Sequence, residues 1–492
     1  MLVAVVAFLV GVAIYDVLQK RHAILRTFPI IGHLRFLLER FGPELRQYIV
    51  TNNDEERPFS RDQRRWVYAS AKRQNSYFGF GSDNHFDEHD YIFIRHSAFP
   101  ATAPSEGPVA VAKVMGQWRN RPGAFRPESI TNVSAMSFGS LSGPAIEALN
   151  RGSKIANCLH NTGEGGISKH HRHGGGLIFQ IGTGYFGARD DTGKFSLDVL
   201  LESMKDAPVR AIEVKLSQGA KPGLGGLLPG AKVTNEIAEA RGVPVGITVA
   251  SPSSHEEFHD VETLVDFVES IAEATGLPVG IKSAIGQVDF WADLAAHMAT
   301  HNRGPDFITV DGGEGGTGAA PQVFADHVSV PFREGFSAVF SAFANVGLQD
   351  DIVFIGAGRL GFASDAVVAM GLGVDMINVA REAMLAVGCI QAQKCHTGHC
   401  PTGVATQQRW LVRGLDPTDK SVRLANYIDA LNHEMVKVAT ATGVSHPALI
   451  DPANIEIRNG DGQLHSVTEH YGLRAEWFGD ARRSKLESAL TD

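Results

Sequence analysis

Three of the chain's four cysteines, Cys389, Cys395 and Cys400, stand close together in the stretch GCIQAQKCHTGHCPTGVATQ, with the spacing C-x5-C-x4-C. Cysteine thiolates bind zinc, iron and iron–sulfur clusters. Zinc sites usually contain C-x2-C pairs, and a zinc site here would need His396 or His399 as its fourth ligand. The common ferredoxin spacing C-x2-C-x2-C is also absent. The residues alone therefore predict a thiolate-bound metal or cluster, with plain buried cysteines as the alternative.

The remaining cysteine and a histidine-rich stretch carry weaker signals. Cys158 lies in an apolar run and is predicted to be structural. The stretch KHHRHGGG, residues 169–176, suggests a metal site only weakly, because such loops are more often solvated or in contact with phosphate. Four cysteines in 492 residues form no disulfide framework, so the clustered trio suits a reducing compartment such as the cytosol.

A second set of chemically useful residues follows a series of short apolar runs. Each of these runs ends in a cluster of glycine and polar residues. The clusters are AMSFGS (135–140), NTGEGG (161–166), QIGTG (180–184), KLSQGAKPG (215–223), IKSAIG (281–286), DGGEGGTGAAP (311–321), GAGRLG (356–361) and NVAR (378–381). One such cluster indicates only a tight turn. Eight of them predict loops that converge on one ligand.

The cluster GAGRLG matches the dinucleotide fingerprint G-x-G-x-x-G, but the match is rejected. The fingerprint expects an acidic residue at the end of the next strand, whereas Asp375 stands at the start of it. In a barrel, the loops after the last two strands form a phosphate site from backbone N–H groups. We therefore expect GAGR and NVAR to form one phosphate cradle, with Arg359 or Arg381 supplying positive charge, and a mononucleotide such as FMN to fit it better than NAD.

The elements that must position these loops alternate between strand and helix. The expected strands are NVSAM, CLHNT, LIFQIG, AIEVKLS, VGIKSA, DFITVDG, DIVFIGAG and DMINVAR, and residues 261–275 are an expected helix. Eight such units predict an α/β fold, a (β/α)8 TIM barrel. VGITVAS, residues 245–251, is a ninth strand-like run, so at least one of the nine is an insertion or is not a strand. The chain after Gln407 is expected to be helical and to pack against the barrel.

Four segments are expected along the chain: a possible anchor helix over 1–18, an Arg-rich lead-in over 19–104, the barrel with its cysteine loop over 105–410, and a C-terminal helical extension over 411–492. Residues 1–15, MLVAVVAFLVGVAIY, carry no charge, but a membrane span usually needs ~20 apolar residues. We favour an uncleaved anchor over a signal peptide or a helix that docks on protein. Residues 20–73 carry twelve Lys and Arg against six acids, which favours a body on the cytoplasmic side of the membrane.

The overall composition excludes one class of partner. The chain is 43% hydrophobic and 20% charged, as expected for a soluble globular body with a sizeable core. Its formal net charge of −9 gives no basic footprint, so we expect no nucleic-acid partner and a small-molecule ligand instead.

Residues 105–410 resemble the FMN-binding synthase domain of glutamate synthase. The matching stretches are SAMSFGS, NTGEGG, IEVKLSQGAKPG, DGGEGGTGAAP and CHTGHCPTGVATQ, in this order along the chain. The resemblance implies an FMN-containing barrel with a [3Fe–4S] cluster on Cys389, Cys395 and Cys400. It also implies that reduced FMN gives a hydride to 2-iminoglutarate, made from 2-oxoglutarate and ammonia, and that this reaction yields L-glutamate.

The resemblance also assigns residue roles. Glu164 handles protons during imine formation, and Lys215, Gln218 and Lys221 face a dicarboxylate substrate. Lys282 lies near the flavin, where its cation favours the anionic reduced ring. The cofactor-binding set is Ala135, Met136, Ser137, Gln180, Lys215, Lys282, Asp311, Gly312, Gly313, Gly356, Gly358, Arg359, Ala380 and Arg381.

The chain departs from the family pattern in ways that bear on substrate and partners. The family's KPGEGGQLPG is KPGLGGLLPG here, so Leu224 and Leu227 stand where Glu and Gln are expected. No arginine for 2-oxoglutarate is found around IKSAIGQ. The amidotransferase domain and a complete NAD(P)H-binding domain are missing, so nitrogen is expected from free ammonia, an amine or a partner, and electrons from ferredoxin or a reductase subunit.

Two other functions compete with glutamate synthesis. The first is an imine reductase for another 2-oxo acid or for an amine, as in N-methylglutamate formation, which Leu224 and Leu227 would favour. The second is a non-catalytic electron-transfer subunit. The retention of Glu164, Lys215, Gln218 and Lys221 argues against that second function.

Overall fold

The computed structural model describes residues 1–102 and 107–491. The chain forms two compact units, Met1–Trp66 and Val67–Asp492. Helix α4, Arg61–Ala71, includes the boundary between them.

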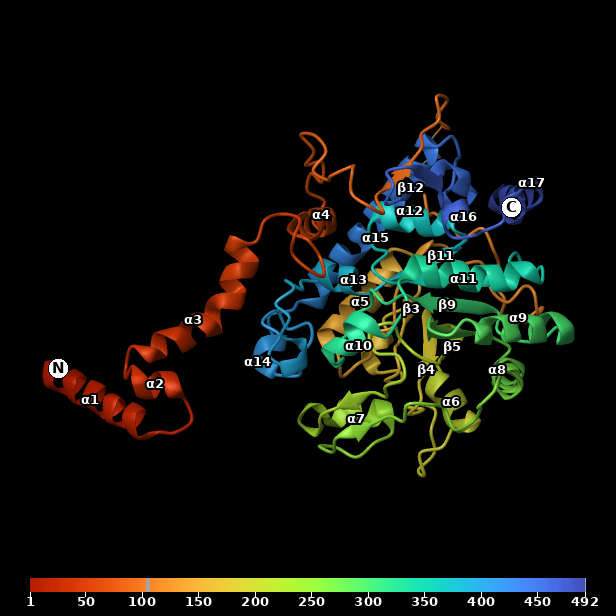
Figure 1. Ribbon diagram of the computed structural model, residues 1–492. Helices are drawn as coiled ribbons and strands as arrows, with labels where there is room; N and C mark the ends of the chain where they lie inside the picture. The colour runs from red at the N-terminus through yellow and green to blue at the C-terminus, as the bar shows by residue number, and fades with distance from the viewer. Residues whose placement is uncertain (103–106, 492) are drawn as a thin grey trace. The chain divides into compact units, whose positions relative to one another are not determined.

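The second unit is built on a closed barrel of eight parallel strands in the order β10-β11-β2-β3-β4-β5-β8-β9 (Figure 1). The strands are β2 (Thr131–Val133), β3 (His160–Asn161), β4 (Leu177–Ile181), β5 (Val209–Lys215), β8 (Val279–Ala284), β9 (Phe307–Asp311), β10 (Val353–Ala357) and β11 (Met376–Val379). Each of the eight predicted runs overlaps one of them, although β2 and β5 begin one and two residues before their runs. Most of their residues are buried on both faces, as expected for parallel strands covered by helices.

Helices surround the barrel and cap the unit. Their bounds are α5 (Gly143–Ile155), α6 (Leu197–Met204), α7 (Asn235–Arg241), α8 (Val261–Thr275), α9 (Asp289–His301), α10 (Gln322–His327), α11 (Phe332–Asn345), α12 (Ala363–Gly371), α13 (Arg381–Ala386), α14 (Arg409–Val412), α15 (Pro417–Ala441), α16 (Val467–His470) and α17 (Asp480–Thr491). The helix predicted over 261–275 is α8. Asp260 caps its first turn, and Gly276 ends it in the left-handed conformation.

The ninth strand-like run lies outside the barrel. Within VGITVAS, only Val249 and Ala250 form a strand, β7, which pairs antiparallel with β6 (Leu227–Leu228). This two-stranded sheet and α7 belong to an insertion between β5 and α8.

The region predicted as a C-terminal helical extension contains a small sheet as well. Helix α15 packs along α5, as expected. Beyond it, β12 (Ile455–Arg458) pairs with β13 (Leu464–Ser466) and with β1 (Ile92–Ile94) from the lead-in. A strand pairing over this sequence distance leaves no local signal, which explains why helix alone was expected.

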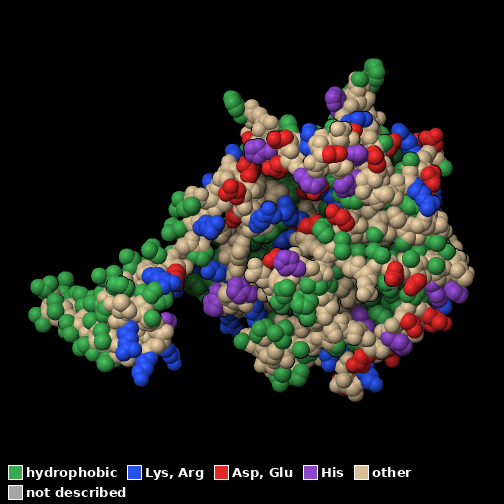
Figure 2. Space-filling model, in the orientation of Figure 1, with side chains coloured by type: hydrophobic (Ala, Val, Ile, Leu, Met, Phe, Trp, Pro, Cys, Tyr) green, Lys and Arg blue, Asp and Glu red, His purple; other side chains and the backbone are tan. Residues whose placement is uncertain are grey.

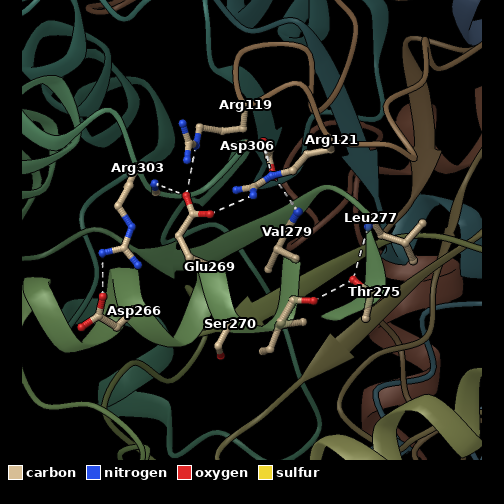
Figure 3. Close-up of polar contacts among 12 residues, drawn as sticks. Arg119, Arg121, Asp266, Glu269, Ser270, Thr275, Leu277, Val279, Arg303 and Asp306 are labelled. Atoms are coloured by element: carbon tan, nitrogen blue, oxygen red, sulfur yellow. Dashed lines mark hydrogen bonds and ion pairs between the residues drawn. The ribbon is translucent and has the colours of Figure 1, made fainter. Parts of the chain in front are cut away.

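A buried ion cluster joins α8 to the start of β8 and β9 (Figure 3). The guanidinium of Arg121 lies 2.8 Å from a carboxylate oxygen of Glu269 and 3.0 Å from one of Asp306. Asp306 also accepts the N–H of Val279 at 2.9 Å, and Glu269 accepts that of Gly304 at 2.8 Å. Although burial disfavours the charge of Arg121, the two carboxylates outweigh it and raise the pKa of Arg121.

The first unit consists of helices. They are α1 (Leu2–Leu18), α2 (Ala23–Thr27) and α3 (Gly32–Leu45), followed by a π-helical turn over Arg46–Val50. Across the described parts of the chain, no helix combines the length and the apolar character that crossing a bilayer requires.

Candidate functional site

A cavity of about 410 Å³ opens at the carboxyl ends of the barrel strands, a volume within the usual range of small-molecule sites. Residues within or directly after all eight strands line it. The glycine-rich loops therefore converge as the sequence predicts, because the carboxyl ends of parallel strands share one face of a barrel.

The cavity contains the four predicted catalytic residues. Glu164 follows β3, and one of its carboxylate oxygens lies 3.2 Å from the ammonium nitrogen of Lys215 at the end of β5. Lys215 also donates to the side-chain oxygen of Gln218 at 2.6 Å. Lys221 is buried and donates to the carbonyl of Gly225 at 2.8 Å. Lys221 is thus a residue of the cavity wall and not a solvated surface lysine.

Electrostatics favour the ionised form of Glu164. Burial raises the pKa of this carboxyl, but the nearby Lys215, Lys221 and Arg241 outweigh burial and hold its pKa below the usual value. Burial lowers the pKa of Lys221, an effect that Glu164 opposes. Glu164 is therefore a carboxylate at neutral pH, suited to accept a proton or to hold a cation.

Arg241, at the end of α7, is a site residue that the sequence reasoning missed. It is 5% exposed and lines the cavity. Its guanidinium donates to the carbonyl of Phe138 at 3.3 Å and lies 5.0 Å from the ring centre of Phe186, while its Nε has no partner among the described residues. An arginine therefore lines the cavity, and it comes from another segment than IKSAIGQ. No motif marks it, since α7 lies in an insertion without a glycine-rich strand end.

Most of the predicted cofactor-binding residues line the same cavity. These are Ala135, Met136, Ser137, Gln180, Lys215, Lys282, Asp311, Gly358, Arg359, Ala380 and Arg381. Gly312, Gly313 and Gly356 are not among the lining residues, and a Cβ at any of them would lie less than 3.0 Å from a neighbouring atom. The side chain of Gln180 is committed to the barrel interior, because its amide donates to Glu213 at 2.6 Å.

The loops after β9 and β10 pack closely at the base of the cavity. Gly358 has φ +137°, and a Cβ there would lie 3.2 Å from the backbone of Gly312, so only glycine suits this turn. The carboxylate of Asp311 accepts the N–H of Gly219 at 3.0 Å and lies 3.5 Å from the ammonium of Lys282. Arg381 donates to the carbonyl of Glu314. Lys282, Arg359 and Arg381 all line the cavity.

An unpartnered buried atom bears on what the cavity can hold. The side-chain oxygen of Asn378 is buried, has no partner among the described residues, and belongs to a residue that lines the cavity. Buried acceptors are normally satisfied. Together with the close-packed glycine turn and the cationic side chains, this free acceptor fits a polar, anionic cofactor such as a flavin mononucleotide.

Of the three clustered cysteines, one lines this cavity. Cys395 lines it and packs against Gly318, whereas Cys400 is buried and Cys389 is half-buried. The sulfur of Cys389 accepts the N–H of Gln391 at 3.4 Å, and that of Cys400 lies 3.5 Å from the hydroxyl of Thr402. Among residues 1–102 and 107–491, no three His, Cys, Asp or Glu side chains are grouped to hold a metal ion. The predicted cluster is therefore not seen as a formed ligand set.

A closed barrel of eight parallel strands with a charged cavity at their carboxyl ends is the arrangement of TIM-barrel enzymes. The model of a conserved region in glutamate synthase matches residues 123–445. The chain belongs to the glutamate synthase family.

Two relatives illustrate the extent of the match. The glutamate synthase large subunit-like protein YerD of Bacillus subtilis is 34% identical over 95% of this chain and 98% of its own length. The archaeal glutamate synthase (NADPH) of Methanocaldococcus jannaschii is 36% identical over 64% of this chain, and the match spans 59% of that relative.

Among solved structures, a mandelate oxidase mutant with an FMN monooxide adduct aligns with a TM-score of 0.44 and 15% identity, over 81% of this chain and 91% of its own. A flavocytochrome b2 mutant with benzoylformate aligns with a TM-score of 0.45 and 12% identity, over 82% of this chain and 79% of its own.

Proposed function

We propose that this chain is an FMN-dependent oxidoreductase of the glutamate synthase type. It reduces 2-iminoglutarate, formed from 2-oxoglutarate and ammonia, to L-glutamate with electrons from ferredoxin or a partner subunit. The observation that carries this proposal is the grouping of Glu164, Lys215, Lys221 and Arg241 in one cavity with the glycine-rich strand ends.

FMN, when bound, supplies the hydride. The residues to hold it are the backbone of Ala135 to Ser137, Lys282, Asn378 and the turn at Gly358, with Arg359 and Arg381 for the phosphate. A cation at Lys282 would stabilise negative charge on the reduced ring.

The remaining cavity residues handle the substrate. Arg241 and Lys221 supply the positive charge that binds a dicarboxylate. The carboxylate of Glu164 accepts a proton from ammonium and holds the amine near the oxo carbon, while Lys215 balances its charge at 3.2 Å. Phe186, Leu228 and Val249 form an apolar part of the wall and limit water at the reacting centre.

We also propose that Cys389, Cys395 and Cys400 bind a [3Fe–4S] cluster. Support comes from their thiol chemistry and from the position of Cys395 on the cavity wall, because an electron-transfer group must lie close to the cofactor that it reduces.

The test is turnover of the purified chain, reconstituted with FMN and iron, supplied with chemically reduced viologen, 2-oxoglutarate and ammonium. We expect L-glutamate to form in proportion to enzyme. Binding of FMN without any reoxidation by this substrate pair would contradict the substrate assignment, and a chain that binds no FMN would contradict the proposal as a whole.

One observation favours the second candidate, a reductase that takes an amine or another 2-oxo acid. Leu227 lines the cavity with 60% of its surface exposed, whereas Leu224 does not line it. A competition between methylamine and ammonia in the same assay decides between the two. Preference for methylamine would replace the first candidate with the second.

A further inference from the structure

Helix α1 exposes apolar side chains around its whole circumference. From Leu2 to Ile14 it has no polar side chain. The large exposed residues are Leu2, Val3, Val5, Val6, Phe8, Leu9, Val10 and Ile14. Successive helical positions are 100° apart, so these residues cover most of the circumference, and the small exposed residues Ala4, Ala7 and Gly11 lie on the remaining side. Figure 2 shows this apolar surface on one face of the N-terminal unit. A groove on a protein covers one face of a helix, whereas lipid covers all of them.

The one charge within α1 is withdrawn from the surface. Asp16 is fully buried, and its carboxylate accepts the backbone N–H of Ile30 at 2.9 Å. The Nε2 of His33 lies 2.9 Å from the same carboxylate. Ile30 and His33 therefore supply the hydrogen-bond partners of the Asp16 carboxylate within the unit. As a result, the outer surface of α1 presents no charge to an apolar phase.

Helix α3 exposes an apolar stripe of its own. Its exposed residues Leu34, Leu37, Leu38, Phe41 and Leu45 recur at helical spacing, so they share one face. The intervening positions include an exposed Arg35–Glu39 ion pair with a 2.8 Å N–O distance. A helix with a wide apolar face and a charged opposite face is typical of the membrane interface.

The charges beside these apolar surfaces have one predominant sign. Residues 20–46 contain six lysines and arginines against two acids. Basic residues next to an apolar segment are attracted to anionic lipid headgroups. This excess of positive charge argues for a lipid surface over a second copy of the chain, whose own basic segment would repel it.

We infer that the unit Met1–Trp66 docks on an anionic bilayer. Helix α1, 17 residues long, enters the hydrocarbon of one leaflet, and α3 lies in the headgroup region. At 1.5 Å per residue α1 is about 26 Å long, shorter than the ~30 Å hydrocarbon core, so the attachment is monotopic. It is independent of the proposed catalytic function.

The test is flotation of the full chain with extruded vesicles of POPC alone and of POPC with one quarter POPG. One variant carries Val5→Asp and Phe8→Asp in α1, and a second carries Leu37→Asp and Phe41→Asp in α3. A matched control carries Ile155→Asp and Val422→Asp, at exposed apolar positions of the second unit. Thermal unfolding verifies that every variant remains folded.

We expect the wild type and the control to float with the POPG vesicles, and the α1 variant to lose at least tenfold in bound fraction. The vesicle-bound fraction of the α3 variant should fall by a smaller factor. Salt at 0.5 M should weaken the binding of the wild type to the vesicles without abolishing it. Unchanged flotation of the α1 variant would overturn the inference. So would a chain that floats with neither vesicle and instead forms dimers that the α1 substitutions dissociate.

Discussion

At the scale of single residues, the carboxylate of Glu164 lies in the cavity among three nearby cations. Glu164 is ionised because Lys215, Lys221 and Arg241 together outweigh the effect of burial on its pKa. A carboxylate in this state acts as a proton acceptor or cation holder and not as a general acid at neutral pH.

Replacing Glu164→Gln should lower kcat by about 10²- to 10⁴-fold, because the substitution removes a proton acceptor and keeps the shape. Steady-state rates with saturating 2-oxoglutarate and ammonium measure this loss, and the flavin spectrum serves as the control. An unchanged kcat would exclude Glu164 from the chemistry.

The same variant has a defined pH signature in stability. The folded pKa of Glu164 is below the usual 4.5, so its contribution is complete above that value and is lost as the pH falls through the folded pKa. We expect the difference in unfolding free energy between wild type and Glu164→Gln to shrink below about pH 4.5. A difference that grows on acidification would contradict this sign.

Arg241→Lys should raise the KM for 2-oxoglutarate by roughly 10- to 100-fold, because a single ammonium cannot reproduce bidentate recognition of a carboxylate. The KM for ammonium and the FMN content should change little. Equal increases in the KM for 2-oxoglutarate and in the KM for ammonium would instead indicate that the variant disturbs the whole cavity.

At the scale of elements, the barrel depends on contacts between its loops and between its helices and strand starts. The turn after β10 approaches the loop after β9 so closely that no side chain fits at Gly358. Arg121 forms buried ion pairs both with Glu269 on α8 and with Asp306, which directly precedes β9. Each feature is local in space and remote in sequence.

Gly358→Ala should reduce FMN affinity and cost about 1–3 kcal/mol of stability, because the variant forces a left-handed residue against the Gly312 backbone. Gly347→Ala is the matched control, since it also has positive φ, +79°, but faces open space. Fluorescence titration with FMN distinguishes them, and equal affinity in both variants would remove Gly358 from the cradle.

Arg121→Met should destabilise the fold by about 3–5 kcal/mol, because two buried carboxylates lose their common partner. Arg303→Met is the control, since its partner Asp266 is 56% exposed and such a surface pair contributes only about 0–1 kcal/mol. Urea denaturation of both variants measures the contrast. A small effect for Arg121→Met would mean that the carboxylates are readily protonated or hydrated.

At the scale of the whole molecule, the proposed function requires the cysteine loop to link the cavity to the source of electrons. Cys395 lines the cavity, whereas Cys158 does not and lies between α5 and β3, where burial raises the pKa of its thiol to about 11. A thiol with so high a pKa stays protonated and is a poor metal ligand.

Cys395→Ala should therefore abolish the roughly three iron atoms per chain expected of a [3Fe–4S] site, while FMN remains bound. Cys158→Ala should leave both contents unchanged. Iron and acid-labile sulfide assays measure this outcome, and iron retention in Cys395→Ala would contradict the ligand assignment.

The sequence by itself determined the barrel strands, the glycine-rich strand ends and the family. Parallel strands buried on both faces read as short apolar runs, and turns that approach a ligand closely require glycine at fixed places, so both signals are local. The residues around Glu164, Lys215 and Gly358 could be found in this way because each lies at or just after the end of its own strand.

The tertiary structure decided what depends on contacts between distant segments. It brought Arg241 from an insertion into the cavity, engaged Gln180 with Glu213, placed β7 outside the barrel and paired β1 with β12. None of these has a periodicity or motif of its own. Once the barrel has closed, some buried polar side chains and strand edges still lack hydrogen-bond partners. The positions of these segments follow from the pairing of those remaining groups.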